Sequence, residues 1–295
     1  MDYSKLPTEK QNPLTVSLDT LSPKKILKLM DREDGRVPFA VRKVNSKIGR
    51  AVALMVSSIK KGGRLFFVGA GTSGRLGILE AAECPPTFNT PPWFVQAVMA
   101  GGRPAVFRSQ EGAEDRQLEA KQQIAKKVKS KDVVVGISAS GVTPFVRAAL
   151  RESRRRGAST ILVACNLSSP LRSLADVVIS PQVGPEVITG STRLKAGTAT
   201  KLILNRLTVT SMIRLGKVYG NWMVDLQPRS RKLKARGLGI LKKLGGLSDR
   251  EAQSIFRKSK GRLKAAILMA KKNLSRHEAL RILKKSGGFL RSALK

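Results

Sequence analysis

The chain has 295 residues, of which 41% are hydrophobic, so it can bury the cores of one large and one small domain, or of two medium ones. Its formal net charge of +36 would attract phosphates, anionic sugars and nucleic acids. No apolar run reaches the roughly 18 residues that a membrane span needs, and the N-terminus has no basic-then-apolar leader pattern. We therefore expect a soluble cytoplasmic protein that does not act at a membrane.

Histidine and cysteine are scarce. The chain has one histidine, His277, and two cysteines, Cys84 and Cys165. A zinc site draws several such ligands from closely spaced motifs, so no metal is expected. A Ser-His-Asp triad would have to use His277, which lies in a basic helical tail. Acid–base chemistry therefore falls mainly to carboxylates or lysines.

The apolar pattern changes along the first two thirds of the chain. Residues 1–34 read as an extended lead-in with a short helix near 24–31, and the apolar spacing over 37–60 predicts one amphipathic helix. Short β-branched-rich runs then alternate with helical stretches, as expected for strands buried on both faces of a parallel sheet. The runs cover 64–68, 93–99, 133–137, 160–164 and 177–180, and the helices 75–82, 113–127, 144–155 and 193–215. This alternation predicts a doubly wound α/β fold with its ligand site at the carboxyl ends of the strands.

The composition changes again near residue 229. From there to the C-terminus the chain has 21 Lys and Arg against three acids, so half of the net charge lies in less than a quarter of the chain. Strand patterns stop, and about four short helices are expected, with Ser248 and Ser275 as N-caps. We expect residues 1–228 to form the α/β domain and residues 229–295 to form a small all-helical domain.

A glycine-rich turn follows the first predicted strand. Its sequence GAGTSG, at 69–74, matches the dinucleotide pattern G-x-G-x-x-G, but no acid lies at the end of the next strand to hold a ribose, so a nicotinamide cofactor is disfavoured. A second hydroxyl-rich turn follows the strand 133–137. Single hydroxyls at such places are usually N-caps, whereas two such turns on one sheet favour a phosphate held by backbone N–H groups and hydroxyls. The candidate binding residues are Gly71, Thr72 and Ser73 in the first turn, and Ser138, Ser140, Gly141 and Thr143 in the second.

Four of the few acids fall into two pairs, Glu80 with Glu83 and Glu111 with Glu114. Spacing of i, i+3 places both members of a pair on one helical face. In a pocket of low dielectric, two carboxylates can serve as acid and base because their pKa values are driven apart. The alternative is that these are solvated surface side chains. The same alternative applies to Lys195, which could neutralise a substrate phosphate or carboxylate.

Four segments resemble the N-acetylmuramic acid 6-phosphate etherase family. They are GAGTSGRLGILEAAECPPTF at 69–88, EGAED at 111–115, VVVGISASGVTPFV at 133–146, and the long segment 184–227. The resemblance runs from Asn12-Pro13 to the Gly-Gly-Phe of 287–289. It implies a flavodoxin-like sugar isomerase (SIS) domain followed by a small helical domain similar to ubiquitin-associated folds. It also implies a cytoplasmic homodimer that needs no cofactor.

The resemblance further implies a lyase of peptidoglycan recycling that cleaves the D-lactyl ether of N-acetylmuramic acid 6-phosphate to N-acetylglucosamine 6-phosphate and D-lactate. The glutamate of ECPPT makes Glu83 the proton donor to lactate, and the second glutamate of EGAED makes Glu114 the base at C2. Glu111 and Lys195 are expected among the substrate-binding residues. This sequence departs from the family pattern at Val142, where Arg is usual, and at Thr200, where Gln is usual.

Two other functions stay open. A non-catalytic sugar-phosphate regulator of the glucokinase-regulatory-protein type uses the same domain, although it would need no paired acid and base. A nucleic-acid-binding protein is the other reading of the basic tail. With 4% aromatic residues and no base-reading motif, specific recognition is disfavoured, and salt-sensitive non-specific binding remains open.

Overall fold

The computed structural model describes residues 3–228 and 230–295, which form two compact units. The first unit extends to Ala82 and resumes over Trp93–Thr208, and the second comprises Glu83–Pro92 and Val209–Lys295. Arg229, where the predicted second domain begins, lies outside the described residues. A domain boundary between residues 228 and 229 therefore remains a prediction.

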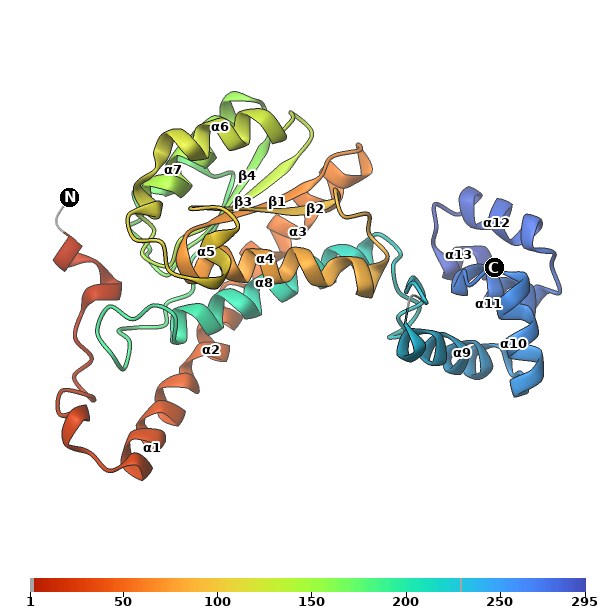
Figure 1. Ribbon diagram of the computed structural model, residues 1–295, viewed down its shortest axis with the longest axis horizontal. Helices are drawn as coiled ribbons and strands as arrows, with labels where there is room; N and C mark the ends of the chain where they lie inside the picture. The colour runs from red at the N-terminus through yellow and green to blue at the C-terminus, as the bar shows by residue number, and fades with distance from the viewer. Residues whose placement is uncertain (1–2, 229) are drawn as a thin grey trace. The chain divides into compact units, whose positions relative to one another are not determined.

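The first unit is built on a five-stranded sheet in the order β2-β1-β3-β4-β5, with every pair of neighbours parallel (Figure 1). This is the flavodoxin-like order, so the predicted α/β class is confirmed. The register aligns Gly69 at the end of β1 with Met99 of β2 and with Ile137 of β3. These three strands therefore end at one edge of the sheet. The strands are β1 Leu65–Gly69, β2 Val95–Met99, β3 Val133–Ile137, β4 Ser159–Val163 and β5 Val177–Ile179.

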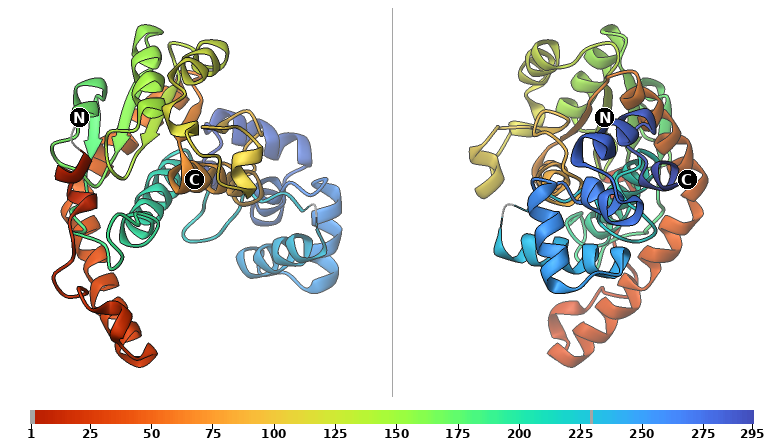
Figure 2. Two further views of the ribbon diagram at one scale, coloured as in Figure 1. Left: turned by 60° about the vertical axis from the view of Figure 1, so that its left-hand side comes forward. Right: turned by 90° about the vertical axis from the view of Figure 1, so that its right-hand side faces the viewer.

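Helices cover both faces of this sheet, which explains why its strands are almost continuously apolar (Figures 1 and 2). On one face α6 and α7 bury apolar side chains against β1, β3 and β4, and α3, α4 and α8 lie on the other face. Gly77 of α4 allows a close approach there, since a Cβ on it would lie 2.8 Å from the Cβ of Phe67. The helices are α3 Asn45–Lys60, α4 Gly71–Phe88, α6 Gln117–Lys127, α7 Pro144–Arg155 and α8 Lys195–Arg214.

Three predicted helices differ from the observed ones. The expected helix over 37–60 is interrupted at Val44 and forms α2 Arg36–Lys43 and α3. Helix α4 is longer than the predicted 75–82, because the glycine-rich turn itself supplies its first residues and the chain stays helical through Pro85 and Pro86. The predicted helix 113–127 divides at Arg116 into a 3-10 turn, Ala113–Asp115, and α6. The remaining short elements of the first unit are α1 Pro23–Asp34, α5 Pro104–Phe107 and the 3-10 turns Tyr3–Lys5, Pro7–Glu9, Leu18–Thr20 and Pro170–Leu174.

In the second unit, the C-terminal chain folds into short helices around an apolar core that includes Leu241, Phe256, Leu268 and Ala279. Both predicted N-caps are confirmed: Ser248 and Ser275 each form a capping box with the glutamate three residues later. Five helices are described where about four were expected: α9 Arg231–Gly245, α10 Asp249–Lys258, α11 Leu263–Lys272, α12 Arg276–Lys285 and α13 Leu290–Leu294. Over the described ranges, none of the helices has the length and apolar character that crossing a membrane requires.

A buried ion pair anchors the N-terminal lead-in of the first unit. The Lys195 ammonium, at the start of α8, pairs with the Glu33 carboxylate of α1, and both side chains are almost fully buried. Asn12 of the lead-in donates to the same carboxylate at 2.8 Å. Burial opposes ionisation of Glu33, but the hydrogen bond and charge of Lys195, with Asn12, hold the pKa of Glu33 below its usual value. The lead-in, α1 and α8 are therefore joined by one charged cluster.

Lys195→Met is expected to lower the free energy of unfolding by about 3–5 kcal/mol, because Glu33 loses its buried cation. The double substitution Glu33→Leu with Lys195→Met should cost less, because no buried charge is left unpaired. Since the pKa of Glu33 is lowered in the folded state, its contribution exists above the unfolded-state pKa and disappears as pH falls through the folded one. Urea titrations over a pH series measure both effects. A single variant as stable as the wild type would contradict this account.

Candidate active site

The glycine-rich turn between β1 and α4 depends on close backbone approach. A Cβ on Gly69 would lie 2.7 Å from the Gly74 nitrogen, and a Cβ on Gly74 would lie 2.8 Å from the Gly69 oxygen. Gly71 has φ +53, in the left-handed region that favours glycine. The first turn of α4, with Thr72 and Ser73, therefore starts immediately at the end of the strand. Helix N-termini have N–H groups without intrahelical partners, and these groups attract anions.

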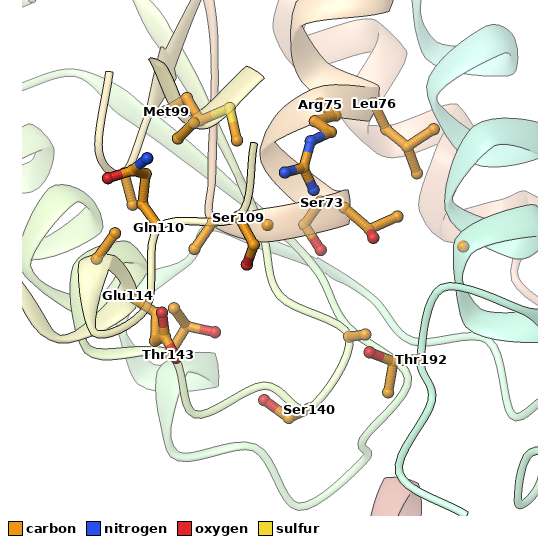
Figure 3. A pocket seen from close by; sticks show the side chains of 18 of the residues that line it. Ser73, Arg75, Leu76, Met99, Ser109, Gln110, Glu114, Ser140, Thr143 and Thr192 are labelled. Carbon is orange, nitrogen blue, oxygen red and sulfur yellow. The ribbon is translucent and has the colours of Figure 1, made fainter. Parts of the chain in front are cut away.

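A pocket of about 360 Å³ opens at this edge of the sheet, within the first unit. It lies beside β1 and β3, where the strand order reverses, which is the usual place for a ligand in such folds. In Figure 3 the side chains of Ser73 and Arg75 project from α4 into the space bounded by Glu114, Ser140 and Thr192. The polar side chains that line the pocket are those of Glu9, Thr72, Ser73, Arg75, Ser109, Gln110, Glu111, Glu114, Ser140, Thr143, Thr192 and Thr200.

The carboxylates Glu111 and Glu114 both line this pocket, in the connection after β2. The prediction that they share one face of a helix is wrong. Glu111 lies in a turn, where its Oε1 accepts a hydrogen bond from Ser109 at 2.9 Å, and Glu114 lies in the 3-10 turn before α6. Gly112 between them has φ +70, in the left-handed region that a regular helix does not use. Their proximity therefore comes from a turn rather than from helical periodicity.

Two of the candidate residues after β3 shape the loop instead of lining the pocket. The Ser138 hydroxyl is 2.7 Å from the Thr143 hydroxyl and accepts from the Gly141 N–H at 3.0 Å. A Cβ on Gly141 would lie 2.6 Å from the Cβ of Ser169, so this position has no room for a side chain. Ser140 and Thr143 are the candidate residues of this turn that line the pocket. Ser138 and Gly141 are therefore positioning residues of the loop.

The expectation that Lys195 binds substrate needs correction. Its ammonium pairs with Glu33, donates to the Pro185 carbonyl at 2.6 Å, and is buried away from the pocket. Its sequence position at the start of a helix did not reveal that α1 supplies a carboxylate at the same place.

Glu83 is exposed and is not among the residues that line this pocket. It lies in α4 on the same stripe as the pocket residues Thr72 and Leu76, to which it is spaced i+11 and i+7. It lies ten positions after Ser73, a rise of about 15 Å along the helix axis. Its predicted partner Glu80 is buried and paired with Lys201 of α8 at 2.5 Å. Only the second predicted pair, Glu111 and Glu114, therefore lies together in the pocket.

Several pocket residues were missed by the sequence analysis. Arg75, which follows the glycine-rich turn directly, donates to the Val106 carbonyl at 2.9 Å and is the one arginine or lysine among the lining residues. Its position just after the first turn of α4 was the available signal. Glu9 enters from the lead-in, and no local pattern marks it. The departures at Val142 and Thr200 differ in consequence, since only Thr200 lines the pocket.

The pocket combines anion binding with acid–base groups. Hydroxyls, helix N–H groups and Arg75 suit a phosphate, while Glu111 and Glu114 can accept or donate protons. In the described part of the chain, no group of three or more His, Cys, Asp and Glu side chains is arranged to hold a metal ion. Cys165 is deeply buried, and burial together with the nearby Glu186 raises its pKa to about 12, so it is a poor nucleophile.

Two known domain families match parts of this chain. Residues 47–154 match the glucokinase regulatory protein N-terminal SIS domain, and residues 114–210 match the SIS domain. Among solved structures, a phosphoheptose isomerase from Francisella tularensis superposes with a TM-score of 0.54 at 16% identity, over 65% of this chain and 100% of that chain. This likeness concerns the fold alone.

Much closer relatives cover nearly the whole chain. The N-acetylmuramic acid 6-phosphate etherase of Geobacillus thermodenitrificans is 46% identical over 290 residues, covering 98% of this chain and 98% of the relative. N-acetylmuramic acid 6-phosphate etherase 2 of Vibrio cholerae is 46% identical over 292 residues, covering 99% and 95%. An etherase of Clostridium beijerinckii is 43% identical over 295 residues, covering 100% and 97%. Identity at this level and over this length means that the chain belongs to the N-acetylmuramic acid 6-phosphate etherase family.

Proposed function

We propose that this protein is a carbon–oxygen lyase that converts N-acetylmuramic acid 6-phosphate to N-acetylglucosamine 6-phosphate and D-lactate. The 46% identity to etherases over nearly the full length of the chain supports this substrate. The observation that carries the chemistry is that Glu111 and Glu114 line the same pocket as residues of the two hydroxyl-rich turns. A phosphate held at these turns would bring the sugar carbons toward the carboxylates.

The proposed reaction needs one base and one acid. In the open-chain sugar the C1 aldehyde acidifies the proton on C2, and the lactyl ether at C3 is β to that carbonyl. Glu114 removes the C2 proton, and the electron pair forms the C2–C3 double bond as the C3–O bond breaks. An acid protonates the departing lactate oxygen. Water then adds across the double bond, with its hydroxyl at C3 and a proton returned to C2.

We propose Glu83 as that acid, supplied by a second copy of the chain in a homodimer. Glu83 lies about 15 Å along α4 from Ser73, which is more than the length of a monosaccharide phosphate. Proton donation by Glu83 within one copy is therefore disfavoured. Within the first unit, the exposed apolar side chains Phe39 of α2 and Leu79 of α4 are consistent with a covered surface.

A second candidate function is a non-catalytic sugar-phosphate regulator, favoured by the match of residues 47–154. The full-length relatives favour the lyase.

Separately, the basic charge of residues 229–295 supports salt-sensitive, non-specific binding of nucleic acid, which enters no step of the proposed reaction. The proposed setting is the cytoplasm, in peptidoglycan recycling.

Glu114→Gln is expected to lower kcat about 10²–10⁴-fold, because general base catalysis is lost while the side-chain shape is kept. A coupled D-lactate assay with N-acetylmuramic acid 6-phosphate measures it, and calorimetry should find product binding retained. Glu119→Gln, in α6 outside the pocket, is the matched control. If the wild type binds the sugar phosphate but releases no D-lactate, the regulator is the better description.

Glu83→Gln is likewise expected to abolish D-lactate release while binding survives. If Glu83 acts across a dimer, mixing inactive Glu83→Gln with inactive Glu114→Gln subunits should restore activity, since each mixed dimer holds one complete site. The assay is run after unfolding and refolding the two variants together. Activity that stays absent in verified mixed dimers would contradict action across the dimer.

Ser73→Ala and Ser140→Ala are expected to raise KM about tenfold with little change in kcat, because each removes a hydrogen-bond donor to a charged phosphate. Ser173→Ala, in the exposed turn before β5, serves as the control. Steady-state kinetics separate the two constants. An unaltered KM in both variants would show that the phosphate is held elsewhere.

A further inference from the structure

The N-terminal lead-in supplies a carboxylate to the pocket. Glu9 is half-buried, ends a 3-10 turn, and lines the pocket together with residues more than sixty positions later in the chain. Its Oε2 lies 2.8 Å from where a Cβ of Gly190 would be, and its Oε1 accepts from Thr8 at 3.1 Å. The bare backbone of Gly190 is therefore what leaves room for this carboxylate beside the pocket.

Hydrogen bonds to α1 and to residues 185–187 hold the lead-in in place. Asn12 donates to Glu33 at 2.8 Å and to the Pro185 carbonyl at 3.2 Å, and Thr15 donates to the Val187 carbonyl at 3.0 Å. Asn12 and Thr15 are themselves buried. A cavity of about 210 Å³ lies beside the lead-in, bounded by Pro7 and Thr8 among others. The hydrogen bonds of Asn12 and Thr15 therefore help to position the segment that carries Glu9.

The chemistry of a carboxylate limits what Glu9 can bind. A carboxylate repels a phosphate dianion, whereas it accepts hydrogen bonds from hydroxyl and amide N–H groups. The hydroxyl-rich turns and Arg75 are the anion-binding side of the pocket, so Glu9 suits the donors of a sugar. It would discriminate a sugar phosphate from phosphate alone.

From these observations we infer that Glu9 is a specificity-determining residue, whose carboxylate accepts a hydrogen bond from a hydroxyl or amide N–H of the phosphosugar. The inference rests on the proposed function for the identity of that sugar. Asn12 is the positioning residue that acts through Glu9. The ion pair of Lys195 and Glu33 anchors the same segment through the hydrogen bond that Asn12 donates to Glu33.

The test is calorimetric binding of N-acetylglucosamine 6-phosphate and of inorganic phosphate to the full-length protein. Glu9→Gln should weaken binding of the sugar phosphate about tenfold or more, because the charged acceptor of this hydrogen bond is replaced by a neutral amide. Binding of inorganic phosphate should stay the same or tighten, since a repelling charge is removed. Asp19→Asn, which neutralises an exposed carboxylate of the same lead-in, should change neither.

A second arm tests the positioning role of Asn12. Asn12→Ala should weaken sugar-phosphate binding in the wild type but add little in the Glu9→Gln background, because its effect passes through Glu9. Equal weakening in both backgrounds would show that Asn12 only supports the fold.

Two results would overturn the role of Glu9: unchanged binding of the sugar phosphate by Glu9→Gln, or equal weakening of both ligands. Because the readout is binding, it also separates the two proposals. A wild-type protein that binds the sugar phosphate but releases no D-lactate would refute the lyase and leave the role of Glu9 standing.

Discussion

The alignment of β1, β2 and β3 is the constraint on which the candidate site depends. These strands run parallel and end at the same level, where Gly69 stands opposite Met99 and Ile137. Every connection that leaves this edge must therefore start within a few ångströms of its neighbours. The glycine-rich turn, the loop of Glu111 and Glu114 and the loop of Ser140 meet there for this reason. None of them would form a pocket alone.

The polar residues near this edge have two different roles. Ser73 and Thr143 line the pocket. Ser138 does not line it, and its hydroxyl instead holds its own loop through Thr143 and the Gly141 N–H. Lys195 shows the same division at the start of α8. Its charge is used to hold α1 and the lead-in, which in turn places Glu9 at the pocket. A structural ion pair therefore contributes to the site without touching a ligand.

Few of the chain's many basic residues line the pocket. Arg75 is the one arginine or lysine among its lining residues, beside the three carboxylates Glu9, Glu111 and Glu114. The one cation suits the anionic substrate, and the carboxylates are the groups that can transfer protons. The tail beyond residue 229 carries its charge on short helices, whose apolar faces form a core together with Val224 and Leu226.

By itself the sequence determined the elements whose signals are local. The apolar runs predicted the parallel strands, because a strand buried on both faces needs apolar residues throughout, and Ser248 and Ser275 identified helix starts because capping involves only neighbours in the chain. Tertiary structure decided which polar groups meet. Lys195 faces Glu33, Glu9 reaches a pocket built from distant loops, and Glu111 and Glu114 converge through a turn, although all of these side chains carry the same local signals as solvated ones. Such meetings depend on how separate segments pack, and residue spacing along the chain does not encode that packing.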